Sequence, residues 1–137
     1  MTFRYETTIP TRYRDLDPMG HVNNAVYASF CEQARMEYFD DVFEMELDAL
    51  NMVLAHLEID YERPIRQGQS VAVRVRVAEI GGSSFTMAFE ILADEALAAT
   101  AESTQVVLGA DGSPTRVPDD WRERVQTFED GVVDDGA

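Results

Sequence analysis

Residues 15–35, DLDPMGHVNNAVYASFCEQAR, place the carboxylate of Asp17 a few residues ahead of an expected helix start. The first turn of a helix carries unpaired backbone N–H groups and about half a positive charge. A base or nucleophile beside such a carbonyl-polarising site is the combination that acyl transfer needs. The segment therefore predicts acyl-transfer chemistry centred on Asp17.

The carboxylate of Asp17 could act as a general base on water, or as a nucleophile that forms a mixed anhydride. The sequence does not choose between these two roles. A structural role is the alternative, because an aspartate at this place can close an Asx-turn or favour the helix dipole. Asp15, two residues earlier, is expected to be structural.

Four neighbours of Asp17 are candidate site residues. Gly20, a candidate for substrate binding, is expected to supply a backbone shape that a side chain would forbid. His21 could orient Asp17 or contact the substrate, and a hydrogen-bonded turn histidine is the alternative. Asn23 could orient the substrate or cap the helix. Tyr27 is a candidate substrate contact whose spacing also fits a core residue.

Glu32 is a second carboxylate on the expected helix and could help position water. The alternative is an i, i+3 ion pair between Glu32 and Arg35. Cys31 lies on the apolar face without a paired base, so we expect it in the core. A single cysteine excludes an internal disulfide and is typical of a reducing cytoplasm, which is the expected location.

A long helix from residue 24 to about residue 43 is expected to carry these groups, with Asn24 (or Asn23) as its N-cap. Roughly 20 residues at 1.5 Å per residue give about 30 Å, enough to cross a small sheet. The apolar face follows the i, i+3, i+4, i+7 spacing and contains Tyr27, Phe30, Cys31, Ala34, Tyr38 and Val42.

Period-2 alternation predicts five strands, and Gly81-Gly82 predicts a hairpin between two of them. One polar face per strand indicates an antiparallel sheet covered on one side, and the long helix is the element available to cover it. Pro10 suggests a bulge or an edge position in the first strand. The sequence therefore predicts an α+β fold whose five-stranded antiparallel sheet wraps around one long helix. The expected strands are residues 3–14, 55–62, 70–77, 85–91 and 97–108.

A short helix is expected from Pro118 to about Phe128, because proline followed by two aspartates suits a first helical turn. The last residues, 129–137, are acidic and glycine-rich, and we expect a disordered tail there. At 137 residues the chain is expected to form a single domain, residues 1–128, followed by this tail.

The net charge of −15 comes from 26 acidic and 11 basic residues, all of the latter arginine. Such self-repulsion should relax as salt shortens the Debye length, so we hypothesise adaptation to a salt-rich, halophilic cytoplasm; an ordinary acidic protein is the alternative. No basic stripe could neutralise phosphates, so we expect no nucleic-acid partner. No apolar run approaches the roughly 20 residues of a membrane helix, and no membrane association or metal site is expected.

The string D-x-D-x-x-G-H-V-N-N-x-x-Y, followed by Glu32 and Arg35, resembles the hotdog-fold acyl-CoA thioesterases, in particular the 4-hydroxybenzoyl-CoA thioesterase-like group. The segment IDYERPIRQGQSVAVRVRVAEIGGSSF, which begins at Ile59, is also similar to that group. The likeness covers residues 3 to about 108. The motif is typical of the superfamily and does not point to one substrate.

The resemblance implies a hotdog fold, a homodimer or homotetramer with active sites at the subunit interface, and cofactor-free hydrolysis of an acyl-CoA. It assigns the catalytic acid to Asp17 and the carbonyl-polarising backbone N–H to Asn24. Some members carry histidine or tyrosine where Asn24 stands, so a mechanism that needs that histidine is in doubt here, whereas a backbone N–H is kept. No strong general acid is needed, because a thiol with a pKa near 8.5 leaves readily.

Coenzyme A would bring phosphates, which arginine binds well. The first candidates to bind these phosphates are Arg63 and Arg66, and Arg74 and Arg76, on a polar strand face, are further candidates. For each of them the alternative is an arginine that is simply solvated at the surface. A non-catalytic acyl-CoA or acyl-carrier-protein binding module is a rival function. A hydratase or dehydratase is a weaker rival, because only His21 and His56 could serve as its acid–base partner.

Overall fold

The computed structural model describes residues 2–45 and 51–136, so Met1 and Ala137, the ends of the expected domain and tail, lie outside the described residues. Its elements follow one another in the order β1 (Tyr5–Ile9), a 3₁₀ turn η1 (Tyr13–Asp15), α1 (Val26–Asp41), β2 (Met52–Tyr61), β3 (Val71–Ile80), β4 (Ser84–Ala93), β5 (Ala96–Val107), α2 (Asp119–Phe128) and β6 (Val133–Asp134).

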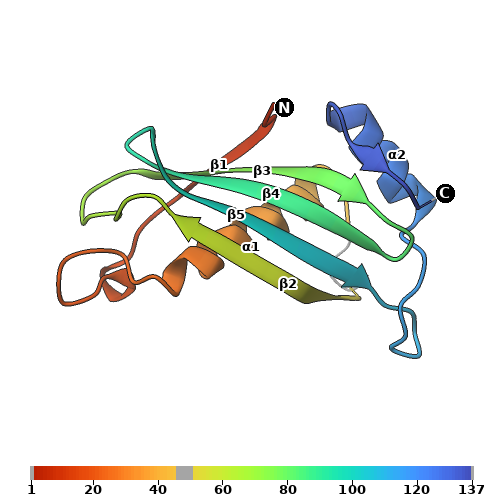
Figure 1. The fold of residues 1–137 in the computed structure, drawn as a ribbon, viewed down its shortest axis with the longest axis horizontal. Helices are drawn as coiled ribbons and strands as arrows, with labels where there is room; N and C mark the ends of the chain where they lie inside the picture. The colour runs from red at the N-terminus through yellow and green to blue at the C-terminus, as the bar shows by residue number, and fades with distance from the viewer. Residues whose placement is uncertain (1, 46–50, 137) are drawn as a thin grey trace.

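Five of the described strands form an antiparallel sheet in the order β1-β3-β4-β5-β2, and α1 lies across one face of it (Figure 1). Alternate residues of β3 and β4 face α1 and are buried, as the period-2 pattern predicts. The hairpin at Gly81-Gly82 is confirmed, because the Gly81 N–H donates to the Ser84 carbonyl at 2.7 Å. The predicted α+β layout with a five-stranded sheet and one central helix is therefore confirmed.

Helix α1 is shorter than the predicted range of 24–43 and begins at Val26. Ala25 occupies the N-cap position, so the prediction of Asn24 or Asn23 there is wrong. The side chain of Asn23 nevertheless accepts a hydrogen bond from the Ala25 N–H at 2.9 Å, which supplies a cap from two residues away. Cys31 is fully buried, as predicted, and burial raises the pKa of its thiol to about 12.

The first strand ends at Ile9 rather than continuing to residue 14, because Pro10 cannot donate a ladder hydrogen bond. Its edge position in the sheet is confirmed. The chain then forms η1, where the buried carboxylate of Asp15 accepts the Arg12 backbone N–H at 2.8 Å. Asp15 therefore fixes the turn that leads toward Asp17.

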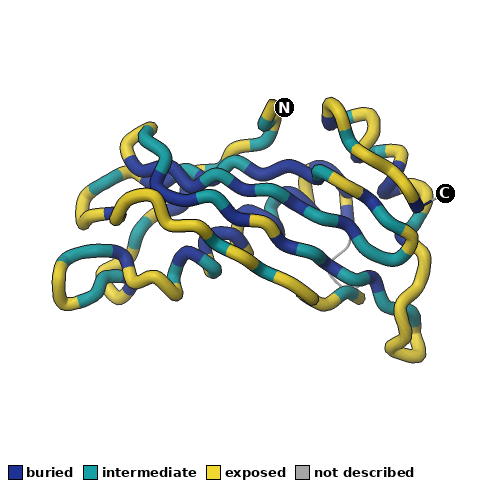
Figure 2. The backbone as a smooth tube through the Cα atoms, viewed as in Figure 1, coloured by how far each residue is buried: buried dark blue, intermediate teal, exposed yellow. Residues whose placement is uncertain are grey.

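Strand β2 lies at the sheet edge opposite β1, and in the described residues it pairs with β5 alone. Most of its residues are exposed (Figure 2), in contrast to β3 and β4. Val53, Leu54 and Tyr61 are about half exposed, at 47%, 47% and 48%. The sheet thus has one open edge that carries apolar side chains.

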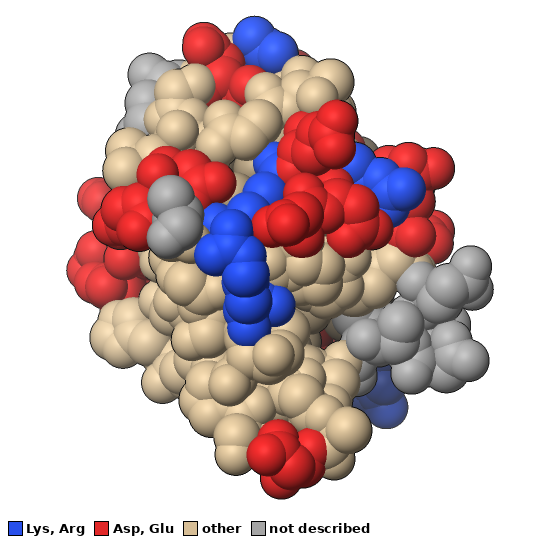
Figure 3. Space-filling model, turned by 90° about the vertical axis from the view of Figure 1, so that its right-hand side faces the viewer, with Lys and Arg blue, Asp and Glu red and all other residues tan. Residues whose placement is uncertain are grey.

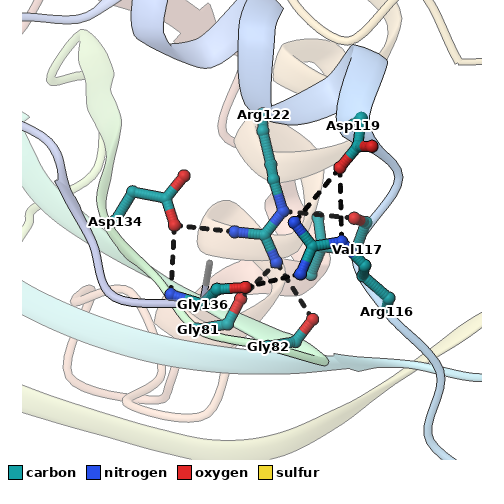
Figure 4. A network of polar contacts seen from close by, with 8 residues as sticks. All are labelled: Gly81, Gly82, Arg116, Val117, Asp119, Arg122, Asp134 and Gly136. Atoms are coloured by element: carbon teal, nitrogen blue, oxygen red, sulfur yellow. Dashed lines mark hydrogen bonds and ion pairs between the residues drawn. The ribbon is translucent and has the colours of Figure 1, made fainter.

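Helix α2 lies at the end of the molecule that faces the viewer in Figure 3, where acidic side chains flank the upper part of a stripe of arginine and uncharged residues border its lower part. Arg122 is buried there and donates to the carbonyls of Gly81 and Gly82 at 2.6 and 3.0 Å and to Asp134 at 2.7 Å (Figure 4). Trp121 stacks on Phe43 with ring centroids 5.3 Å apart. These contacts fix the predicted C-terminal helix against the β3–β4 turn and the end of the core.

Residues 129–136 differ from the expected disordered tail. Strand β6 pairs in parallel with β3 through Glu79↔Val133 and Ile80↔Asp134, beyond the stretch of β3 that β1 covers. The buried carboxylate of Glu129 accepts the Tyr38 hydroxyl at 2.6 Å and the Val77 N–H at 3.1 Å. The acidic, glycine-rich composition of these residues indicated disorder, because composition carries no information on such long-range contacts.

Candidate active site

A tight hairpin turn presents Asp17. The Asp17 N–H donates to the His21 carbonyl at 2.7 Å, and the Gly20 N–H donates to the Asp17 carbonyl at 3.1 Å. Gly20 has φ +79° with open space around its Cα, so its backbone conformation, rather than crowding, requires glycine. The predicted reason for a glycine at this position is confirmed.

The carboxylate of Asp17 divides its two oxygens between different environments. Oδ1 accepts the N–H groups of Met19 at 2.9 Å and His21 at 3.1 Å, which closes an Asx-turn. Within residues 2–45 and 51–136, Oδ2 has no hydrogen-bond partner. The turn-closing role foreseen as an alternative is therefore present, and it leaves one oxygen of a half-buried carboxylate available for chemistry.

The start of α1 offers an unused backbone donor. The Asn23 N–H donates to the Asp15 carbonyl at 2.8 Å, while the Ala25 and Val26 N–H groups donate to the side chain and carbonyl of Asn23. The N–H of Asn24, between them, makes no hydrogen bond with any described residue. It is exposed at the positive end of the helix, where it can donate to an oxyanion.

His21 and Arg66, separated by 45 residues, are brought together. An Arg66 guanidinium nitrogen lies 2.9 Å from Nε2 of His21, and the backbones of the two residues form an isolated bridge. Because a guanidinium has only donors, Nε2 of His21 is the acceptor in this contact. The Gln67 N–H also donates to the Gly20 carbonyl at 3.1 Å. The loop after β2 thus supports the Asp17 turn.

Tyr61 is a residue of this region that the sequence reasoning missed. Its hydroxyl donates to the Asn24 carbonyl at 2.9 Å. Its ring meets that of Tyr27 edge to face, with centroids 4.9 Å apart. Tyr27 itself is 1% exposed, so in this chain it has almost no surface for a substrate, and burial raises the pKa of its hydroxyl.

The candidates Glu32 and Arg63 make no hydrogen bond or ion pair with the residues of this cluster in the described part of the chain. Glu32 is exposed and forms no ion pair with Arg35 among the described residues. Arg35 is buried, which lowers its pKa, and one of its terminal nitrogens has no partner in the part of the chain described. Arg63 is exposed, and its side chain makes no hydrogen bond within the described ranges.

The remaining candidates from the sequence make contacts in other parts of the molecule. Arg74 pairs with Glu6 at 2.9 Å on the outer face of the sheet. Arg76 is buried and donates to the Asp130 carbonyl at 2.9 Å, so it is not a surface phosphate ligand here. His56 lies 3.1 Å from Glu58 on exposed β2. Neither arginine joins the Asp17 region.

A groove of about 410 Å³ lies between the end of β1 and α1. Its lining includes Asp15, Val26 and Phe30, but not Asp17 or Asn24. Among residues 2–45 and 51–136, no group of three or more histidine, cysteine, aspartate or glutamate side chains could hold a metal ion. No helix in these ranges has the length and hydropathy needed to cross a membrane.

The chain is similar in sequence to a family of thioesterases and to individual thioesterases. Residues 11–125 match the thioesterase-like superfamily. The chloroplastic acyl-acyl carrier protein thioesterase ATL2 of Arabidopsis thaliana is 30% identical over 133 residues, which cover 91% of this chain and 70% of that protein. The long-chain acyl-CoA thioesterase FadM of Escherichia coli (strain K12) is 30% identical over 82 residues, 58% of this chain and 62% of that protein.

A solved structure is more similar still. A thioesterase of Thermus thermophilus, crystallised in complex with coenzyme A and zinc, is 40% identical to this chain. The two superimpose with a TM-score of 0.84 over 90% of this chain and 92% of that one.

Proposed function

Because the chain belongs to the thioesterase-like superfamily, whose hotdog fold it shares, we propose that it hydrolyses an acyl-CoA thioester to the free acid and CoA without a cofactor. The observation that carries the proposal is the free Oδ2 of Asp17 on a turn that leads into the free N–H of Asn24. A carboxylate and an oxyanion donor are the two groups that this reaction needs.

In the proposed reaction, the thioester carbonyl oxygen accepts the Asn24 N–H and lies at the positive end of α1. On one route, Oδ2 of Asp17 takes a proton from water as the water oxygen attacks the carbonyl carbon. The tetrahedral oxyanion then collapses and expels the thiolate of CoA. No strong acid is needed for this step, because the thiol pKa is about 8.5.

On the other route, Oδ2 itself attacks the carbonyl carbon and the thiolate leaves, which gives a mixed anhydride that water then hydrolyses. Both routes use the same oxygen and the same N–H. The Met19 and His21 N–H groups hold Oδ1 and so orient the carboxylate for either. Asp17 is accordingly proposed as base or nucleophile.

The proposed assembly is a homodimer or homotetramer with active sites at the subunit interface. The open edge of β2, with half-exposed Val53 and Leu54, supports this assembly, because an unpaired edge is a template for another strand. Tyr61 lies on the same strand and contacts Asn24, so a partner that pairs with β2 would lie beside the helix start.

A non-catalytic module that binds acyl-CoA or an acyl-carrier protein is the second candidate. It is favoured by the engagement of Oδ1 of Asp17 in the turn, which a purely structural aspartate would also show.

The names of the relatives include both kinds of thioester, and the Thermus structure contains coenzyme A. CoA is therefore the donor proposed first.

The test is release of free thiol from a panel of acyl-CoAs and acyl-carrier-protein thioesters, measured in molar potassium chloride. Turnover of acyl-CoA would support the enzyme. Binding of acyl-CoA without turnover of either donor would support the binding module and contradict the proposed hydrolysis.

A further inference from the structure

Tyr13 lies on the turn η1 and is 88% exposed. A single exposed aromatic side chain is ordinary and explains nothing alone. Tyr13, however, stands between Arg12 and Arg14, in a chain whose net charge is −15. An exposed aromatic ring with an arginine on either side of it in the sequence suits a ligand that joins a flat ring to negative charge.

The charges around Tyr13 are available to such a ligand. Arg14 is exposed, and its side chain has no hydrogen bond or ion pair within the described part of the chain. Arg12 lies 3.4 Å from Asp15 and keeps a side chain 57% exposed. No acidic residue occurs from Thr7 to Arg14. The exposed turn from Arg12 to Arg14 therefore carries two positive charges, with the carboxylate of Asp15 beside Arg12 and that of Glu37 against Thr7.

The segment also lies close to the proposed chemistry. Arg14 and Asp17 are three positions apart, a span of at most about 11 Å along the chain. The acid-free loop of residues 63–70 lies at the same end of the molecule (Figure 1), tied to the Asp17 turn by the Arg66–His21 contact. A long, flexible thioester arm whose reacting end lies at Asp17 can bend to place its far end on this surface.

We infer that the Arg12–Tyr13–Arg14 turn binds the nucleotide end of coenzyme A, with the adenine stacked on Tyr13 and a phosphate held by Arg14. The inference rests on the proposed function and deepens it, because it selects CoA as the donor. A base stacks well on an exposed aromatic face, and arginine matches phosphate geometry. A carrier-protein thioester has no adenine and could not make the stacking contact with Tyr13.

The test compares two thioesters of the same acyl group, one of CoA and one of N-acetylcysteamine, which lacks the nucleotide. For Tyr13→Ala and for Arg14→Ala we expect KM for acyl-CoA to rise about five-fold or more, with kcat unchanged. Kinetics with the short thioester should not change. Tyr13→Phe keeps the ring and should retain the wild-type KM. Arg74→Ala removes the same charge from the outer sheet face and is the matched control.

Calorimetric titration with CoA alone gives a second readout, in which binding should weaken in Tyr13→Ala but not in Tyr13→Phe. Equal KM changes for both thioesters, or unchanged CoA binding in Tyr13→Ala and Arg14→Ala, would overturn the inference. Wild-type turnover confined to carrier-protein thioesters would also overturn it. Failure of the wild type to hydrolyse any thioester, with CoA binding lost in Tyr13→Ala, would contradict the proposed function but support this site.

Discussion

The hydroxyl of Tyr61 donates a hydrogen bond to the carbonyl oxygen of Asn24 at 2.9 Å, across 37 residues of sequence. This bond joins the end of the open edge strand β2 to the residue whose free N–H precedes α1. It restrains the peptide that follows Asn24, while Asn23 and its hydrogen bonds restrain the peptide before it.

Tyr61→Phe should lower kcat for acyl-CoA by about five-fold, because a neutral hydrogen bond contributes about 1 kcal/mol and its loss frees the Asn24 backbone. The ring contact with Tyr27 is kept, so KM should change little. Steady-state kinetics measure kcat and KM separately and so distinguish the two effects. Thr127→Val on α2 also deletes a hydroxyl that donates to a backbone carbonyl, and should leave kcat unchanged. Equal kcat for Tyr61→Phe and the wild type would show that the bond does not position the N–H.

If the proposed oligomer forms through β2, Leu54→Arg should give a monomer and abolish turnover, because it places a charge on the apolar open edge of that strand. Light scattering gives the mass, and thiol release gives the activity. Val133→Arg, on a side chain 57% exposed in β6, is the control and should change neither. An active monomeric Leu54→Arg protein would contradict an active site at the subunit interface.

The buried carboxyl of Glu129 should make stability depend on pH. Burial raises its pKa above the ordinary value of 4.5, against the opposing effect of the Tyr38 and Val77 hydrogen bonds and the charge of Arg76. Since the folded state then binds the proton more tightly than the unfolded chain, this group's contribution to the free energy of unfolding falls as pH rises from about 4.5 through the raised pKa.

Glu129→Gln keeps an oxygen acceptor for Tyr38 and Val77 but cannot ionise. Its unfolding free energy, from urea titrations at several pH values, should therefore rise relative to the wild type as pH increases above about 4.5. Glu123→Gln on the exposed face of α2 controls for the loss of one negative charge. A difference between Glu129→Gln and the wild type that does not vary with pH would refute this assignment.

The charge of −15 should make thermal stability rise with potassium chloride. Between about 0.1 and 1 M salt the Debye length falls from about 10 to about 3 Å, which screens the repulsion between acidic side chains such as those in Figure 3. Scanning calorimetry at neutral pH should show the increase. At about pH 4, where many carboxyls are protonated, the increase should be much smaller. A melting temperature that is independent of salt at neutral pH would argue against the halophilic hypothesis.

The sequence predicts the regular elements well where periodicity is long. The helix and four of the strands follow from apolar spacing over seven or more residues, and the turn between β3 and β4 follows from Gly81-Gly82. The end of β1 at Ile9 depends on a local competition, in which Pro10 stops the ladder and Asp15 closes a turn. Such competition is not visible in alternation alone.

The site is only partly predictable for the same reason. The short spacing from Asp17 to Gly20 fixes a turn that the sequence already indicates, and the structure adds that one carboxylate oxygen remains free. The pairing of His21 with Arg66 and the bond from Tyr61 to Asn24 join distant segments. Tyr61 continues the apolar alternation of β2, so the pattern assigns it to the core, and its hydrogen bond gives no local signal.

The most direct test of the account is the effect of Asp17→Asn on release of free thiol from acyl-CoA in molar potassium chloride. Asp111→Asn is the matched control, since the Asp111 carboxylate also accepts the N–H two residues later, at 3.0 Å, in the turn that follows β5. We predict that Asp17→Asn abolishes hydrolysis while keeping the melting temperature of the wild type, and that Asp111→Asn remains fully active. Near wild-type turnover by a folded Asp17→Asn protein would contradict the catalytic role of Asp17.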